Sequence, residues 1–184
     1  LLFKAIGINW LVKVGPSLVE TSFRIGLPIK GIIKSTVFKQ FCGGESMNDC
    51  ERTIDALFEY QIGSILDYSV EGKEAEVEFD HTMEETINTV LKAKGNPKIP
   101  FCVFKVTGLA RFELLEKVNS KQSLNAQEQA EFDKVKHRIE MICEHAYKNN
   151  VRIFIDAEES WIQDAIDALA REMMLKFNHT KAIV

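Results

Sequence analysis

The chain has 184 residues, of which 46% are hydrophobic and 27% are charged. This composition is typical of a folded soluble domain, and the length excludes a complete eight-unit α/β barrel, which needs about 250 residues. The formal net charge of -4 is unevenly distributed, because residues 1–44 carry six basic residues against Glu20 alone, for +5, and the remainder carries -9.

Four cysteines are spread along the chain without a Cys-x-x-Cys pair. We predict that they are reduced, mostly buried thiols of an intracellular protein, rather than disulfide partners or metal ligands. No run of roughly 18 apolar residues occurs and no cleavable signal is evident, so no spanning helix is predicted.

Residues 1–44 are predicted to form an N-terminal helical arm, broken at Gly15-Pro16 and at Gly26-Leu27-Pro28. Within this arm, residues 23–41 interleave apolar side chains with lysines, a pattern that suits an amphipathic helix on an anionic membrane surface. The alternative is an arm that packs against its own barrel or a partner's.

The second predicted domain, residues 45–184, alternates helices with short apolar strands. Asp49 is the predicted N-cap of a helix that runs to about residue 61, and a first strand then ends at Asp67. Helix is predicted over residues 71–94, where apolar side chains recur at intervals of three or four, and Gly95-Asn96-Pro97 ends it.

The second and third strands are predicted over residues 99–106 and 151–156. Between them, residues 111–149 indicate two helices interrupted near residues 119–125, with caps among residues 123–125. A helix over Ser160–Phe177 follows, and another apolar run begins at Lys181. Such a βα series predicts a parallel sheet with its helices outside.

Each predicted strand is an apolar run that ends in a charged residue: Asp67, Lys105 or Asp156. The run is typical of a parallel strand buried on both faces, and the charge is typical of the catalytic rim of a barrel. We therefore predict an α/β fold, the front half of a (β/α)8 TIM-like barrel with an N-terminal helical arm. Residues 45–184 would supply about three and a half βα units, with the three charges at one mouth.

A lysine between two carboxylates at such a mouth supports more than one chemistry. It can hold a substrate carboxylate while the acids orient an amine or take a proton, or it can form a Schiff base, as class I aldolases do. The spacing alone does not decide between these two chemistries. It also leaves open that the three charges form a structural ion pair, or that the chain is a non-catalytic fragment. No GxGxxG, P-loop or Gly-x-Ser-x-Gly motif occurs, and no metal site is predicted, because the histidines fall away from the strand ends.

Three segments carry a more specific signal: residues 66–72 (LDYSVEG), residues 104–109 (FKVTGL) and residues 151–163 (VRIFIDAEESWIQ). In order and spacing they resemble the first-strand, second-strand and third-strand motifs of the proline dehydrogenase family, flavoenzymes that oxidise proline to pyrroline-5-carboxylate. The likeness extends from about residue 41 to residue 184.

The resemblance implies a role for each matched residue. Lys105 would pair with the carboxylate of L-proline, and Asp156 would lie beside the flavin and the ring nitrogen of the substrate. Ala157 would approach FAD through its backbone. Glu71 would be a gate residue that closes the site over the substrate, and Asp67 would line the base of the site.

The same resemblance implies FAD as the cofactor, a quinone as the electron acceptor and peripheral membrane contact through residues 1–44. We predict no nucleic-acid partner. We expect a cytoplasmic location, peripheral on the inner membrane, which would be the mitochondrial inner membrane in a eukaryote. The family's main flavin-binding strands and its pair of substrate-binding arginines have no counterpart in residues 1–184. We therefore expect the isolated chain neither to retain FAD nor to oxidise proline.

Overall fold

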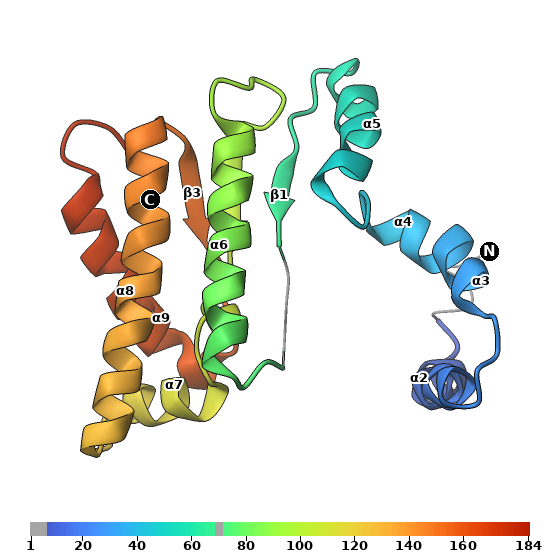
Figure 1. The fold of residues 1–184 in the computed structure, drawn as a ribbon, viewed down its shortest axis with the longest axis horizontal. Coiled ribbons are helices and arrows are strands. Elements are labelled where there is room, and N and C mark those ends of the chain that lie inside the picture. The colour runs from blue at the N-terminus through green and yellow to red at the C-terminus, as the bar shows by residue number, and fades with distance from the viewer. Residues whose placement is uncertain (1–6, 69–71) are drawn as a thin grey trace. The chain divides into compact units, whose positions relative to one another are not determined.

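The structure is a computed structural model in which residues 7–68 and 72–184 are described. It divides into two compact units, of which the first ends at Thr53 and the second comprises Ile54–Val184 (Figure 1). Glu71, the predicted gate residue, lies outside the described residues.

The first unit is helical. Helix α2 (Asn9–Arg24) is followed by α3 (Lys30–Ile33), a π-helical turn (Lys34–Phe38) and α4 (Lys39–Phe41). The predicted break at Gly26-Leu27-Pro28 is confirmed, and Gly26 adopts a φ of +73°, which favours glycine. Residues 23–41 therefore do not form one continuous amphipathic helix. No helix in the described part of the chain is long and apolar enough to cross a membrane.

The predicted break at Gly15-Pro16 is wrong, because α2 continues through Pro16. A proline inside a helix removes the hydrogen bond to the carbonyl four residues earlier. That carbonyl belongs to Val12, which is 51% exposed, so water can replace the missing donor.

Helix α5 (Met47–Phe58) begins before its predicted cap. The backbone N–H of Asp49 donates to the Oγ of Ser46 (3.2 Å), whose hydroxyl in turn donates to the Asp49 carboxylate (2.9 Å). The prediction of Asp49 as the N-cap is therefore wrong. Ser46 has that role, and Asp49 lies in the first turn, where a carboxylate is favourable for the helix dipole.

The second unit contains a three-stranded parallel sheet in the order β1-β2-β3, formed by β1 (Ile65–Asp67), β2 (Phe101–Phe104) and β3 (Arg152–Ile155). Leu66 pairs with Cys102, and Cys102 pairs with Ile153, so the three apolar runs are in register. The parallel α/β sheet is as predicted, although the second and third strands are shorter than their predicted ranges.

Helices α6 (Glu76–Ala93), α7 (Phe112–Asn119), α8 (Ala126–Asn149) and α9 (Ser160–Phe177) accompany the sheet. Helix α9 has its predicted bounds. The predicted interruption before α8 is confirmed, and the side chain of Asn125 caps α8 by accepting hydrogen bonds from two N–H groups of its first turn. The helix predicted over residues 71–94 begins only at Glu76, where the Glu78 carboxylate accepts a hydrogen bond from the N–H of Ala75.

Helices α6 and α8 pack against the sheet on one side (Figure 1), and α9 packs against α7 and α8. The strand side chains buried there are Leu66, Cys102, Phe104 and Ile153. Alternate side chains point the other way, and of these Ile65 and Phe154 are each 46% exposed. The prediction of strands buried on both faces is therefore wrong for the described residues. The apolar runs are continuous because most side chains on the second face of the sheet are also apolar, although no described element packs over Ile65 and Phe154.

We call this second face the open face. It carries Ile65, Asp67, Phe101, Val103, Arg152 and Phe154. The rings of Phe101 and Phe154 stack with centroids 4.7 Å apart, and the guanidinium of Arg152 lies over the Phe101 ring at 5.5 Å. The open face is thus an ordered aromatic surface.

The apolar run predicted to begin at Lys181 lies beside β3. The N–H of Ile153 donates to the carbonyl of Ile183 (2.7 Å). The side chain of Asn178 holds this segment by accepting hydrogen bonds from the N–H groups of Ile183 and Val184. Residues 181–184 are not assigned to a strand, but this bond places them at the β3 edge of the sheet.

Candidate active site

Lys105 and Asp156 occupy neighbouring positions at the carboxyl ends of β2 and β3. Phe104 pairs with Ile155, and the ladder continues because the N–H of Asp156 donates to the carbonyl of Phe104 (3.0 Å). Lys105 has an extended backbone (φ -103°, ψ 139°), so the alternation of β2 continues through it to the open face. Neighbouring strands are about 4.8 Å apart, and the two opposite charges therefore leave the sheet side by side.

Asp67 lies on the same face but further from the rim. The register places it level with Val103 and Phe154, which precede Lys105 and Asp156 by two residues. Two residues of strand span about 6.6 Å. The structure thus brings Lys105 and Asp156 together and leaves Asp67 one layer below them.

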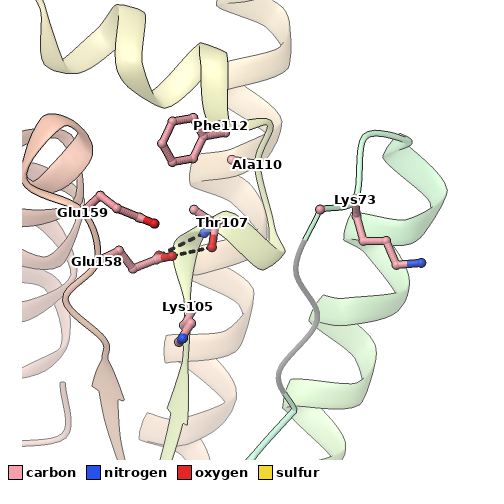
Figure 2. Close-up of a pocket in the computed structure, with 8 residues that line it drawn as sticks. Lys73, Lys105, Thr107, Ala110, Phe112, Glu158 and Glu159 are labelled. Carbon is pink, nitrogen blue, oxygen red and sulfur yellow. Dashed lines mark hydrogen bonds between the residues drawn. The ribbon is translucent and has the colours of Figure 1, made fainter. Parts of the chain in front are cut away.

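An open pocket of about 390 Å³ lies beyond the strand ends. It is lined by Gly72, Lys73, Lys105, Thr107, Ala110, Phe112, Glu158 and Glu159. Thr107, Glu158 and Glu159 lie around this space in Figure 2 and Lys105 lies below them at the strand end, whereas the side chain of Lys73 extends away from it and its ammonium donates to Glu78 (2.7 Å). The volume lies in the lower part of the range for small-molecule sites. Asp67, Asp156 and Ala157 are not among the lining residues.

Thr107 and Glu158 connect the two loops above the strand ends, a pair that the sequence reasoning did not single out. The backbone N–H of Thr107 donates to one carboxylate oxygen of Glu158 (3.1 Å), and the Thr107 hydroxyl donates to the other. We call these two bonds the Thr107–Glu158 bridge. A sequence signal does exist, because Thr107 follows Lys105, and Glu158 follows Asp156, at the same distance of two residues.

The end of β3 is ordered by the Asp156 carboxylate, which accepts a hydrogen bond from the N–H of Ala157 (3.1 Å). Ala157 itself is exposed. This short contact fixes the orientation of the Asp156 side chain at the point where the chain leaves the sheet.

Arg138, on α8, is a second feature that the sequence reasoning missed. It is only 2% exposed, and its guanidinium donates to Asp80 (2.7 Å), to Glu76 and to the backbone carbonyl of Leu109 (3.2 Å). It also lies over the ring of Phe79 at 5.5 Å. Arg138 therefore joins the start of α6 to the turn that follows β2, and this turn lines the pocket through Thr107 and Ala110.

The charge of Arg138 affects its acidic partners. Burial on its own would raise the pKa of Glu76, but the hydrogen bonds and charges of Arg138 and Lys134 outweigh it and hold that pKa below its ordinary value. Glu76 is therefore ionised at neutral pH and continues to pair with Arg138.

The buried cysteines are poor nucleophiles. Burial raises the pKa of Cys102 to about 11 and that of Cys143 to about 12, so neither forms much thiolate at neutral pH. The prediction of mostly buried thiols holds for these two, whereas Cys42 is exposed and Cys50 half-buried.

Together these residues can bind a small zwitterion. Lys105 offers a cation and Asp156 an anion at adjacent strand ends, and the loops above them are fixed by the Thr107–Glu158 bridge. Both carboxylate oxygens of Glu158 accept hydrogen bonds from Thr107, whereas Asp156 accepts one from the N–H of Ala157 and lies beside Lys105, so Asp156 is the better placed acidic group for a substrate amine.

Comparison with known proteins relates this chain to one protein family. The model of the proline dehydrogenase family matches residues 50–184. The chain is 27% identical over 223 residues to proline dehydrogenase 1, mitochondrial, of Dictyostelium discoideum, covering 100% of this chain and 39% of that protein. Identity is also 27% over 211 residues with proline dehydrogenase 1, mitochondrial, of Arabidopsis thaliana, covering 94% of this chain and 42% of that protein.

A further relative bears a different name. The chain is 28% identical over 155 residues to the carbapenem antibiotics biosynthesis protein CarD of Pectobacterium carotovorum subsp. carotovorum, covering 84% of this chain and 41% of that protein. The chain therefore spans about two fifths of the length of the curated relatives that it matches.

Proposed function

The chain belongs to the proline dehydrogenase family, and we propose that it forms part of a flavin-dependent enzyme that oxidises L-proline to 1-pyrroline-5-carboxylate and passes the electrons to a quinone. The observation that carries the proposal is the adjacency of Lys105 and Asp156 on the open face. The names of the relatives from Dictyostelium discoideum and Arabidopsis thaliana support L-proline as the substrate.

Two opposite charges at neighbouring strand ends match the two ionic groups of an amino acid. The ammonium of Lys105 would bind the proline carboxylate, and such a charged hydrogen bond contributes about 1.5–3 kcal/mol. The carboxylate of Asp156 would accept a hydrogen bond from the ring nitrogen and orient it while its proton is lost. FAD would supply the two-electron acceptor for the hydride that leaves the ring carbon beside that nitrogen. Loss of that hydride from carbon, together with one proton from nitrogen to solvent, would convert the amine into the imine.

The other matched residues have supporting roles in this proposal. Asp67 would line the base of the site, one layer below Lys105 and Asp156. Glu71 would act as a gate over the bound substrate.

The end of β3 fits the edge of a flavin ring. Ala157 is exposed and carries only a methyl group, so a flat ring can approach the backbone there without a clash. The bond between Asp156 and the Ala157 N–H holds this backbone in place. The described pocket residues supply no glycine-rich loop for a pyrophosphate, and we therefore propose that the 184-residue chain alone does not retain FAD.

We also propose that the sheet is part of a (β/α)8 barrel, with the open face as its interior. Hydride transfer needs a site from which water is excluded. The 46% exposure of both Ile65 and Phe154 shows that water reaches the open face in this structure. On this ground, the isolated chain is proposed to be inactive towards proline.

The proposal is tested by comparing the 184-residue chain with the full-length product of its gene. The full-length protein is expected to purify yellow with bound flavin and to reduce a dye when proline is added, and the isolated chain to do neither. A full-length protein that binds flavin but ignores proline would refute the proposed substrate. A yellow, proline-oxidising 184-residue chain would refute its proposed inactivity.

Borohydride trapping separates this function from a class I aldolase-like lyase. A Schiff-base lysine is activated by desolvation, whereas Lys105 is half-buried and lines an open pocket. We expect no covalent label on Lys105 after borohydride treatment with a carbonyl substrate. Substrate-dependent labelling of Lys105 would favour the lyase instead.

We further propose that residues 1–44 bind the surface of an anionic membrane, at which a quinone could be reached, on the mitochondrial inner membrane in a eukaryote. The support is the charge of +5 together with the exposure of Trp10 (63%), Leu18 (56%) and Ile32 (64%). Replacing Lys30, Lys34 and Lys39 by Ala should reduce flotation with phosphatidylserine vesicles. Replacing the exposed Lys94, Lys121 and Lys148 by Ala should leave this flotation unchanged. Flotation that is insensitive to salt and to the first set would contradict the proposal.

A further inference from the structure

Glu158 stands at the junction of three segments. It receives both bonds of the Thr107–Glu158 bridge, and its own N–H donates to the side-chain carbonyl of Gln163 on α9 (2.8 Å). The amide of Gln163 in turn donates to Asp167, one turn further along (2.7 Å). Glu158 therefore connects the turn after β3 to the turn after β2, through the two bonds drawn in Figure 2, and to the first turns of α9, through Gln163.

The bridge is placed symmetrically about the two charges of the proposed site. Thr107 lies two residues beyond Lys105, and Glu158 lies two residues beyond Asp156. Below them, the last bond of the sheet joins the Asp156 N–H to the Phe104 carbonyl. The two strand ends are thus bonded on both sides of the Lys105 and Asp156 pair, on one side by a backbone hydrogen bond and on the other by the side chain of Glu158.

We propose that Glu158 is a positioning residue, which sets the distance between the Lys105 ammonium and the Asp156 carboxylate for the reaction. The inference rests on the proposed function for its catalytic consequence, and on the Thr107–Glu158 bridge for its structural part. Both oxygens of Glu158 accept hydrogen bonds from Thr107, so Glu158 acts through the geometry of the loops and does not take a proton from the substrate.

A positioning role and a proton-accepting role predict different results for two substitutions. In Glu158→Gln, the amide oxygen can still accept from the Thr107 N–H, and the amide nitrogen can donate to the Thr107 hydroxyl, which can act as an acceptor. In Glu158→Ala both bonds are lost. A positioning residue is therefore rescued by Gln, whereas a general base is not, because an amide cannot accept a proton.

The experiment measures proline-dependent dye reduction by the full-length gene product and its variants. We expect Glu158→Ala to lower kcat/KM for proline by about 10–100-fold, the usual effect of misplacing catalytic groups. The kcat/KM of Glu158→Gln should stay within a few-fold of that of the unsubstituted protein. The control substitution Asp164→Ala, at an exposed position on α9, should leave kcat/KM unchanged. The proposal is overturned if Gln is as damaging as Ala, or if Ala has no effect.

Hydrogen exchange at the Thr107 amide supplies a readout that does not depend on activity. Exchange should be slow in the unsubstituted protein and in Glu158→Gln, and faster in Glu158→Ala. Unchanged exchange in the Ala variant would overturn the bridge. If the full-length protein fails to oxidise proline, the proposed function falls, and the exchange data still decide whether Glu158 holds the two loops together.

Discussion

Replacing Arg138 by Met should destabilise the second unit substantially. Met keeps most of the side-chain volume, so the change removes the guanidinium and its hydrogen bonds without opening a large cavity. Three acceptors lose the guanidinium as a donor: Asp80, the carbonyl of Leu109, and Glu76, which keeps the ammonium of Lys134 at 3.3 Å. The expected cost depends on how well water can replace that donor for each of them.

The three acceptors differ in exposure. The side chains of Glu76 and Asp80 are 39% and 57% exposed, so both can be rehydrated, and their contribution is far below the roughly 3–5 kcal/mol of a fully buried broken ion pair. Leu109 is fully buried, and an unsatisfied buried carbonyl costs about 1–3 kcal/mol. We therefore expect Arg138→Met to lower the free energy of unfolding by about 2–4 kcal/mol.

Urea unfolding of the 184-residue chain, followed by far-UV circular dichroism, measures this loss. Arg171→Met, at an exposed position on α9, is the matched control and should change the free energy of unfolding by less than about 0.5 kcal/mol. An Arg138→Met variant as stable as this control would refute the reasoning.

The effect of Arg138→Met should also depend on pH in a defined direction. The folded-state pKa of Glu76 is held below its ordinary value, so its pairing stabilises the fold above the unfolded pKa of about 4.3 and is lost as the pH falls through the folded pKa. The difference between Arg138→Met and the unsubstituted chain should therefore shrink below about pH 4. A difference that grows on acidification would contradict this sign.

Three further predictions concern separate parts of the chain. Lys105→Met should lower kcat/KM of the full-length protein for proline by about 10–150-fold, chiefly through KM, in steady-state dye reduction; an unchanged KM would remove Lys105 from carboxylate binding. At pH 8, a thiol reagent followed by mass spectrometry should label Cys42 rapidly and Cys102 and Cys143 only after denaturation, because burial raises the pKa of both. Asn125→Ala removes the side-chain cap of α8 and should cost about 1 kcal/mol in urea unfolding.

Much of the fold was predictable because its local signals agree. Helix α9 has apolar side chains at intervals of three or four and follows a strand after a four-residue turn, and its bounds are those predicted. The cap at Asn125 was predictable for the same reason, since a cap residue stands directly before a periodic segment. Ser46 and Asp49 show the limit of such signals. Both residue types cap helices, and the backbone geometry decides between them.

Part of the candidate site was likewise predictable from the sequence, and part was not. The sequence indicates Lys105 and Asp156 because each follows an apolar strand, and the sheet then brings them to neighbouring positions. The matching two-residue offsets of Thr107 and Glu158 hint at the Thr107–Glu158 bridge, but they do not establish it, because its partners are 51 residues apart and meet only in the folded chain. The sequence also does not predict that Arg138 is buried and bonded, because a lone arginine in an amphipathic helix suggests a surface position.

The open face makes substrate binding depend on whatever covers the sheet. Apolar Ile65 and Phe154 share this face with Lys105 and Asp156, so a segment that buries the first pair also excludes water from the second. The attraction between two unit charges 4 Å apart rises from about 1 kcal/mol in water to about 4 kcal/mol near a protein surface of lower polarity. Covering the open face would therefore strengthen the attraction between the Lys105 ammonium and a substrate carboxylate, even if Lys105 itself did not move. Stability of the sheet and affinity for the substrate are thus expected to change together.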